Sequence, residues 1–183
     1  MRAKLSIVGA AGRMGKRIVS LAKDVDQLDI IGAVEIGGHP DVGKDAGLVA
    51  GVELINVKLG NVYPAGADVA IDFSVPETAD KTVDYCLEND AALVLGTTGL
   101  SDQHREKIKA ASAKIPIIYG TNMSVGMNVL FSLVGKAVSM LGGEWDIEII
   151  EQHHRFKKDA PSGSALTHAE NICKAAGMDF PGC

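Results

Sequence analysis

A glycine-rich turn near the N-terminus constrains the fold of this chain more than any other feature. An apolar run at residues 5–8 leads into the turn, which spans Gly9 to Gly15, and apolar residues then recur at helical spacing up to residue 22. A second apolar run follows at residues 28–34. A strand, a tight turn, a helix and a second strand in this order predict a β-α-β unit with a right-handed crossover. We therefore expect an α/β fold built on a parallel sheet.

Strands and helices continue to alternate after this unit. The glycine-rich stretch at residues 36–51 predicts a surface loop, and residues 52–57 form a weaker strand candidate. Further strands and helices are predicted in turn at residues 67–73, 77–89, 91–95, 101–114 and 116–119. This order predicts a doubly wound parallel sheet of the Rossmann-like type.

The pattern changes after Gly120, where a second domain is expected to begin. Asn122 or Ser124 can cap a long helix that ends at the paired glycines 142–143. Residues 145–149 then alternate between apolar and acidic, which predicts a half-exposed strand, and another helix begins near Ser162. We place the dinucleotide-binding domain at residues 1–122 and the start of an α+β substrate and oligomerisation domain at residues 123–183. Because one strand and two helices are few elements for a domain, we expect this second domain to be incomplete.

The glycine turn suits a dinucleotide. Its small residues let the backbone approach a pyrophosphate, and the helix that follows presents free N–H groups and the positive end of its dipole. Glu35 lies 20 residues after Gly15, at the end of the second strand, where a carboxylate can accept hydrogen bonds from the adenosine ribose. Alternatively, the glycines only permit a tight turn and Glu35 is a solvated strand end. The complete β-α-β context favours cofactor binding.

The same segment bears on the choice between NADH and NADPH. Glu35 would repel the 2′-phosphate of NADPH, whereas Arg13, Lys16 and Arg17 near the turn could attract it. The sequence therefore favours NADH without excluding NADPH.

Composition excludes several classes of protein. The net charge is −5, with 18 Lys and Arg against 23 Asp and Glu and no long basic run, so a nucleic-acid partner is not expected. The apolar N-terminal run is too short for a signal peptide or a membrane span. Three scattered cysteines predict neither a disulfide framework nor a zinc site and are expected to be thiols. We expect a cytoplasmic protein with a small-molecule partner.

The segment at residues 151–164 carries the densest chemistry in the chain. It holds two adjacent histidines, an arginine and two lysines, followed by a proline and a serine-glycine-serine run that can open a helix. Cations beside a helix N-terminus suit a substrate with more than one negative charge, and His and Lys are usual proton donors. A solvated basic loop is the alternative. No metal site is expected, because adjacent side chains in a strand point in different directions and no further ligand spacing is present.

Several motifs together carry a resemblance to a known family. The chain resembles the dihydrodipicolinate reductase family, the 4-hydroxy-tetrahydrodipicolinate reductases of the diaminopimelate route to lysine. The motifs occur in the family's order at residues 8–15 (VGAAGRMG), 72–74 (DFS), 96–99 (GTTG), 122–126 (NMSVG) and 151–165 (EQHHRFKKDAPSGSA).

The resemblance implies a role for particular residues. It makes His153 and Lys157 the catalytic pair, and it assigns the binding of substrate carboxylates to His154, Gly163 and Ser164. It assigns the dinucleotide to Gly9, Ala10, Ala11, Gly12, Arg13, Met14 and Glu35. The residues expected to border the nicotinamide and its ribose are Gly96, Thr97, Thr98, Gly120, Thr121, Asn122 and Met123.

The implied reaction is the NAD(P)H-dependent reduction of a cyclic dicarboxylate. A hydride reaches C4 of the substrate, and His153 or Lys157 protonates the neighbouring carbon. Ile36 stands where family members often carry a basic residue, which strengthens the preference for NADH. The family's C-terminal third, which completes the substrate domain and builds a homotetramer, has no counterpart in this chain. Two alternatives therefore stand: a non-catalytic NAD(P)-binding fragment or module, and another NAD(P)-dependent dehydrogenase of an anionic substrate.

Overall fold

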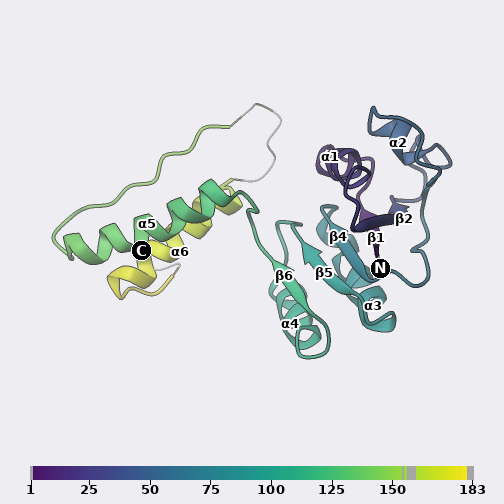
Figure 1. Cartoon of the computed structure of the whole chain (residues 1–183). Coiled ribbons are helices and arrows are strands. Elements are labelled where there is room, and N and C mark those ends of the chain that lie inside the picture. The colour runs from purple at the N-terminus through teal and green to yellow at the C-terminus, as the bar shows by residue number, and fades with distance from the viewer. Residues whose placement is uncertain (1, 154, 156–159, 181–183) are drawn as a thin grey trace. The chain divides into compact units, whose positions relative to one another are not determined.

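The computed structural model describes residues 2–153, 155 and 160–180, and it divides the chain into two compact units at residues 1–120 and 121–183 (Figure 1). The first unit contains, in chain order, β1 (Ala3–Val8), α1 (Arg13–Ala22), β2 (Leu28–Val34), α2 (Ala46–Val49), β3 (Leu59–Gly60), β4 (Val69–Asp72), α3 (Pro76–Glu88), β5 (Ala92–Leu95), α4 (Asp102–Ala111) and β6 (Ile117–Tyr119). The second contains α5 (Val125–Leu141) and α6 (Gly163–Ala176).

The first unit is built on a six-stranded sheet in the order β3-β2-β1-β4-β5-β6. Every pair of neighbouring strands is parallel. This is the strand order of a doubly wound, Rossmann-like fold, in which the direction of winding reverses between β1 and β4. The predicted fold class is confirmed.

Helices cover both faces of the sheet (Figure 1). In β4, Ala70 packs in a buried cluster with α3 and α4, whereas its neighbours Val69 and Ile71 pack against a second cluster that includes Val19 of α1. Because successive side chains of a strand point to opposite faces, a strand that is apolar at every position must be covered on both sides. The near-continuous apolar runs in the sequence reflect this burial.

Helix ends follow the capping residues of the sequence. Ser101 accepts a hydrogen bond from the His104 N–H at the start of α4, and Ser124 accepts one from the Met127 N–H at the start of α5. Of the two candidate caps for α5, Ser124 is therefore the one that begins the helix. Gly142 ends α5 with a φ of +78°, a conformation that glycine adopts without strain.

Two expectations for residues 36–57 are wrong. Residues 46–49 of the expected loop form the short helix α2, and residues 52–57 form no strand. The backbone of that segment bonds to α2 instead, because the Val52 N–H donates to the Gly47 carbonyl and the Ile55 N–H donates to the Asp45 carboxylate. The third strand is the shorter β3, which follows this segment.

The strand expected at residues 145–149 is also absent from the described part of the chain. Trp145, Ile147 and Ile149 instead line a cavity of about 510 Å³ beside α5 and α6. A β-strand needs a neighbour to accept its backbone hydrogen bonds, and among the described residues of the second unit none offers one. Residues 145–149 thus have the alternating pattern of a strand but no neighbouring strand to pair with among the described residues.

The second unit packs α5 against α6. Phe131 of α5 and His168 of α6 meet edge to face with ring centroids 4.6 Å apart, and Ile172 and Cys173 are buried. Cys86, in the first unit, is a buried free thiol, as expected. Cys173 is disulfide-bonded, so the expectation that every cysteine is a thiol is wrong at that position.

Candidate functional site

The glycine turn brings the end of β1 into close contact with two other segments. Gly9 has a φ of +74°, and a Cβ atom there would lie 2.9 Å from the Ser74 Cα atom. A Cβ atom at Gly15 would lie 2.1 Å from the Gly9 carbonyl oxygen. Both positions therefore require glycine: the first for the turn and the second for packing of α1 on the strand.

The N-terminus of α1 supplies the donors that the sequence predicted. The helix begins at Arg13 after Gly12, whose own N–H donates to the Gly9 carbonyl. The N–H groups of the first helical turn, beginning with those of Arg13 and Met14, have no acceptor within a helix. Together with the helix dipole, they form an anion site of the kind that holds a pyrophosphate.

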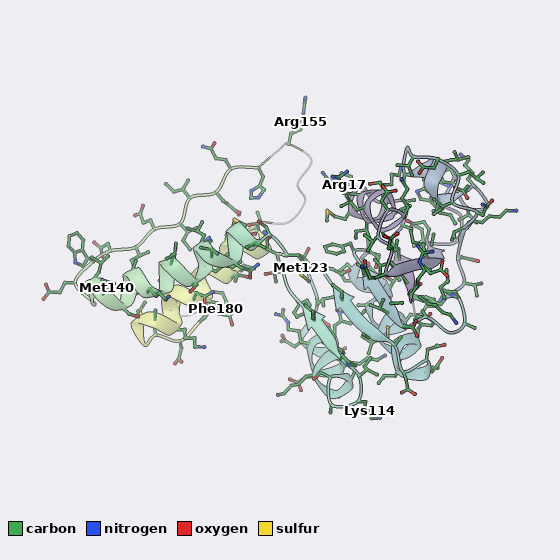
Figure 2. The ribbon with its side chains drawn as sticks, viewed as in Figure 1. Arg17, Lys114, Met123, Met140, Arg155 and Phe180 are labelled. Carbon is green, nitrogen blue, oxygen red and sulfur yellow. The ribbon has the colours of Figure 1, made fainter. Side chains whose placement is uncertain are left out.

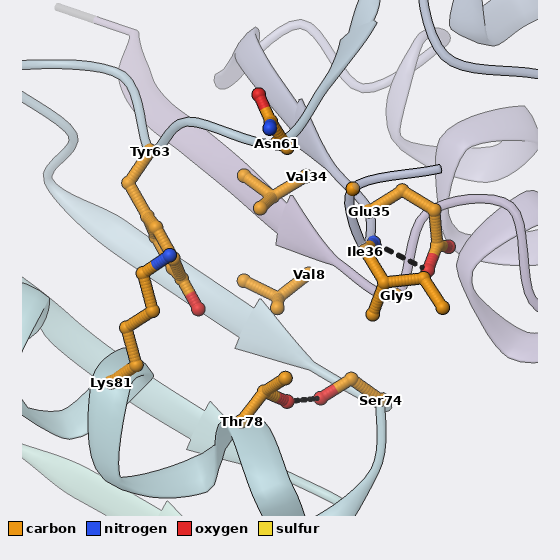
Figure 3. A pocket seen from close by; sticks show the side chains of 11 residues that line it. Val8, Gly9, Val34, Glu35, Ile36, Asn61, Tyr63, Ser74, Thr78 and Lys81 are labelled. Atoms are coloured by element: carbon orange, nitrogen blue, oxygen red, sulfur yellow. Dashed lines mark hydrogen bonds between the residues drawn. The ribbon is translucent and has the colours of Figure 1, made fainter. Parts of the chain in front are cut away.

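Glu35 lies directly beside this turn. Its Oε2 atom accepts a hydrogen bond from the Ala11 N–H at 3.0 Å. Its Oε1 atom accepts one from the Ile36 N–H at 2.9 Å, which Figure 3 shows as a dashed line. A carboxylate oxygen has two lone pairs, so each oxygen can accept a further hydrogen bond from a ribose hydroxyl. The contact between Glu35 and Ala11 also places a negative charge next to the phosphate-binding backbone.

A cavity of about 240 Å³ opens at this edge of the sheet, where β1 lies between β2 and β4 (Figure 3). Ligands of doubly wound folds bind at this point, where the strand order reverses. The side chains of Val8 and Val34 form an apolar part of the lining. The complete lining comprises Val8, Gly9, Val34, Glu35, Ile36, Gly37, Asn61, Tyr63, Ser74, Thr78 and Lys81.

Tyr63 and Lys81 were not anticipated from the sequence. The Lys81 Nζ atom lies 5.4 Å from the centroid of the Tyr63 ring, and both side chains line the cavity opposite Glu35 (Figure 3). They come from different segments, the loop after β3 and the helix α3, and no short motif connects them. Only their common position at the carboxyl edge of the sheet could have indicated them.

A buried carboxylate, which belongs to the motif at residues 72–74 but was given no role there, joins the loops around the cavity. Asp72, at the end of β4, is inaccessible to solvent. Its Oδ1 atom accepts hydrogen bonds from the Ser74 N–H at 2.8 Å, the Ser74 hydroxyl at 2.5 Å and the Thr97 hydroxyl at 3.0 Å, and its Oδ2 atom accepts one from the Thr82 hydroxyl at 2.6 Å. The signal available in the sequence was an acid that ends an apolar strand.

This network alters the interpretation of the loop at residues 96–99. The Thr97 hydroxyl is occupied, since it donates to Asp72 and accepts from the Ser74 N–H, and its side chain is buried. Thr97 can therefore contribute only backbone groups to a ligand. Gly96 packs closely as well, because a Cβ atom there would lie 2.1 Å from the Phe73 ring. Thr98 is exposed and remains free to contact a ligand.

In the second unit, two predicted site residues bond to each other. The Asn122 side-chain amide donates to the Ser164 hydroxyl at 3.1 Å, and Thr121 and Thr167 share a hydrogen bond of 2.8 Å. Met123, labelled in Figure 2, lies next to Asn122 and is partly exposed. The segment before α5 is thus attached to the start of α6, which joins a predicted cofactor residue to a predicted substrate residue.

The start of α6 provides a second group of free N–H donors. Ser162 caps the helix by accepting from the Ala165 N–H, and Gly163 and Ser164 occupy the first turn. Such a helix N-terminus favours a carboxylate. His153 lies close to this point in the chain, with its Nδ1 atom 3.4 Å from Oε2 of Glu151. His154 and Lys157 lie outside the described residues.

Within the described residues, no group of three or more His, Cys, Asp or Glu side chains is placed to hold a metal ion. In the same part of the chain, the helices are too short or too polar to cross a membrane.

Comparison with known proteins identifies the family. Residues 3–123 match the model "Dihydrodipicolinate reductase, N-terminus", and residues 126–179 match "Dihydrodipicolinate reductase, C-terminus". The chain is 40% identical over 180 residues to the 4-hydroxy-tetrahydrodipicolinate reductase of Citrifermentans bemidjiense, covering 97% of this chain and 67% of that protein. It is 44% identical over 176 residues to that of an Anaeromyxobacter species, covering 94% and 65%.

A solved structure agrees in fold. The dipicolinate-bound dihydrodipicolinate reductase from Paenisporosarcina sp. TG-14 superposes with a TM-score of 0.67 at 22% identity, covering 100% of this chain and 71% of that one. The chain spans about two thirds of the length of the curated relatives it matches. With both family models matched in sequence order and a Rossmann-like sheet in the first unit, the chain belongs to the dihydrodipicolinate reductase family.

Proposed function

We propose that this chain forms the cofactor domain and the front of the substrate domain of a cytoplasmic, NAD(P)H-dependent 4-hydroxy-tetrahydrodipicolinate reductase. One observation carries the proposal: the α1 N-terminus, the close-packed glycines and the Glu35 carboxylate meet at the point where the strand order of the sheet reverses. Doubly wound folds bind dinucleotides at this point. Family membership supports the choice of reaction.

The residues present fit a nicotinamide dinucleotide. A Cβ atom at Gly9 or Gly15 would collide with backbone atoms of the chain itself, so the tight turn before α1 requires glycine at both positions. Glu35 would bind the ribose hydroxyls, and the first turn of α1 would bind the pyrophosphate. When bound, the cofactor supplies the hydride. The position of Glu35 supports NADH as the preferred form, because a 2′-phosphate would meet the carboxylate.

The second unit would bind the substrate. In this proposal, the start of α6 at Gly163 and Ser164 binds one substrate carboxylate, with Asn122 holding the Ser164 hydroxyl in place. His153, or Lys157, donates a proton to the substrate carbon next to the reduced one. His154 is proposed to bind a second carboxylate, and the full-length protein is proposed to be a homotetramer.

The direct test is turnover. NADH absorbance is followed while the substrate is generated in the cuvette by the preceding synthase, with a control that lacks the substrate. We expect substrate-dependent oxidation of NADH. His153→Gln and Lys157→Ala are expected to reduce kcat by roughly 10²- to 10⁴-fold with NADH binding retained. Lys114→Ala, at an exposed lysine of the first unit, is the matched control and should leave both unchanged.

The other outcomes separate the alternatives. NADH binding without turnover identifies a cofactor-binding fragment, for which the shorter length relative to the curated relatives is the supporting observation. Turnover with a different keto acid or semialdehyde in a substrate panel identifies another dehydrogenase of an anionic substrate. Failure to bind NADH would contradict the proposal as a whole.

A further inference from the structure

The carboxylate of Glu151 lies between Ser162, which caps α6, and the imidazole of His153. Its Oε1 atom accepts a hydrogen bond from the Ser162 N–H at 2.9 Å, and its Oε2 atom lies 3.4 Å from Nδ1 of His153. Oε2 is shielded from solvent, although 28% of the whole Glu151 side chain is exposed, and its contact with His153 is an ion-pair contact rather than a hydrogen bond. One side chain therefore contacts both the residue that caps α6 and an imidazole.

The negative charge of Glu151 favours one position for the proton on the ring of His153. A carboxylate only accepts protons and hydrogen bonds, so the favourable neutral form of the ring carries its proton on Nδ1, the nitrogen in contact with Oε2. The other ring nitrogen, Nε2, is then the one that exchanges a proton with a ligand. The ring is accessible for this exchange, because 38% of the His153 side chain is exposed.

We infer that Glu151 is a positioning residue, which holds the imidazole of His153 with its proton on Nδ1 and attaches that orientation to the N-terminus of α6. The inference rests on the proposed function for its catalytic meaning, since His153 is there the proton donor. In that step the N–H bond at Nε2 breaks and a C–H bond forms on the substrate. The neutral ring that remains keeps its proton on Nδ1, the nitrogen in contact with Glu151.

The hydrogen bond between Glu151 and Ser162 connects the proposed proton donor to the proposed carboxylate site at the start of α6. Ser162 is 4% exposed and caps the helix whose first turn contains Gly163 and Ser164. Because Glu151 accepts the Ser162 N–H, the imidazole is oriented relative to the N–H groups that are proposed to hold a substrate carboxylate. A shift of the helix start would thus move the carboxylate site and the acid together.

The test uses Glu151→Gln, which has nearly the same shape. Its amide oxygen can still accept the Ser162 N–H, but its amide nitrogen then faces His153 and donates to Nδ1, which favours the proton on Nε2. Nitrogen NMR of the labelled protein, without cofactor or substrate, distinguishes the two neutral ring forms. We expect the Nδ1–H form in the original protein and the Nε2–H form in the variant. Glu148→Gln, at an exposed acid in the same segment, is the matched control and should not change the ring.

A kinetic readout separates positioning from general structural support. Glu151→Gln is expected to reduce kcat by about tenfold or more while KM for NADH stays within about twofold. Amide resonances of residues 162–165 report whether the start of α6 is kept. If they move, Glu151→Asp, which keeps the charge, replaces the first variant and is expected to keep the Nδ1–H form.

Each result has one meaning. An unchanged ring form in Glu151→Gln, or an Nε2–H form in the original protein, overturns the inference. A changed ring form in Glu151→Gln supports it. If the ring form changes but the original protein shows no turnover, the inference stands and the proposed function fails, so the two failures can be told apart.

Discussion

Gly15 lies where the first turn of α1 passes over the end of β1. A Cβ atom there would be 2.1 Å from the Gly9 carbonyl oxygen and 2.6 Å from the Ala10 Cα atom, and both are backbone atoms that no rotamer change can move. The only relief is a displacement of α1, which would carry its N–H groups away from the phosphate position. The constraint on this residue is thus also a constraint on ligand binding.

Gly15→Ala is therefore expected to destabilise the first unit by roughly 1–3 kcal/mol and to weaken NADH binding. Urea unfolding and a fluorescence titration with NADH measure the two effects. Gly126→Ala is the matched control, because it too lies in the first turn of a helix and its Cβ atom would meet only the Ser124 hydroxyl, at 3.9 Å. The control is expected to be neutral or stabilising by about 0.5–1 kcal/mol. Equal effects at both positions would contradict this account.

In the proposed function, Glu35 selects between the two nicotinamide cofactors. Its carboxylate is fixed by the N–H groups of Ala11 and Ile36, so it cannot swing away from a 2′-phosphate without losing both hydrogen bonds. Glu35→Ser is expected to lower the ratio of the NADPH to the NADH dissociation constant by about tenfold or more. Titration of each cofactor measures the ratio. The control variant Glu106→Ser, at an exposed acid on α4, should leave the ratio unchanged. If Glu35→Ser also leaves the ratio unchanged, the Glu35 carboxylate plays no part in cofactor selection.

At the scale of elements, Asp72 connects β4, α3 and the loop after β5. Tyr63 extends the network, because its hydroxyl lies 2.8 Å from that of Thr82, which in turn donates to Asp72. A buried carboxylate stabilises the folded state only when each group that donates to it keeps this acceptor. A buried donor without an acceptor costs free energy of folding. Hydrogen bonds to the Asp72 carboxylate, directly from Ser74 and through Thr82 from Tyr63, therefore fix this edge of the cavity.

Asp72→Asn is expected to destabilise the first unit by roughly 2–4 kcal/mol. The neutral amide of Asn accepts weaker hydrogen bonds than the carboxylate does, and its nitrogen must face a group that donates to Asp72 in the original protein. All three tyrosines of the chain lie in the first unit and the single tryptophan, Trp145, lies in the second, so tyrosine and tryptophan signals follow the two units separately. Asp84→Asn, on α3, breaks an exposed ion pair of 2.8 Å to Lys107 of α4 and should cost less than about 1 kcal/mol. A loss of similar size in both variants would contradict the role given to the network.

At the scale of the whole molecule, the core of the first unit is sensitive to alkaline pH. Burial raises the pKa of Tyr63 from 10.0 to about 12 and the pKa of the Cys86 thiol from 9.0 to about 12. Both groups are neutral when protonated, and the folded state resists their ionisation. Their contribution to stability is therefore complete below the ordinary pKa values and is lost as the pH rises toward 12.

We expect the free energy of unfolding of the first unit to fall as the pH rises above about 9, with a slope of up to about 1.4 kcal/mol per pH unit for each group that titrates. Urea unfolding at a series of pH values, followed by the tyrosine signal, measures the slope. Cys86→Ala removes one of the two groups and is expected to reduce the slope below that of the unchanged protein. A slope that is the same in the variant would show that the thiol does not contribute.

Local patterns were sufficient for much of the fold. The period of apolar residues predicted the strands of the parallel sheet, and the serines at 101, 124 and 162 predicted where helices begin. These signals are local because a cap or a strand face is decided by residues that are close in the chain. Residues 52–57 and 145–149 show the limit: their pattern is that of a strand, but a strand also needs a neighbour, and pairing is a property of the tertiary structure.

The sequence by itself determined the α/β fold, the glycine turn, and the identity of Glu35 and His153 as candidate functional residues. Only the tertiary structure decided that the Glu35 carboxylate bonds to Ala11, that Tyr63 and Lys81 share a cavity, that Asp72 accepts hydrogen bonds from two loops and a helix, and that Glu151 lies against His153. The physical reason is distance along the chain. Hydrogen bonds between residues 10 to 25 positions apart, such as those of Asp72 with Thr82 and Thr97, form only when separate elements meet at one edge of the sheet, and no local pattern records that meeting.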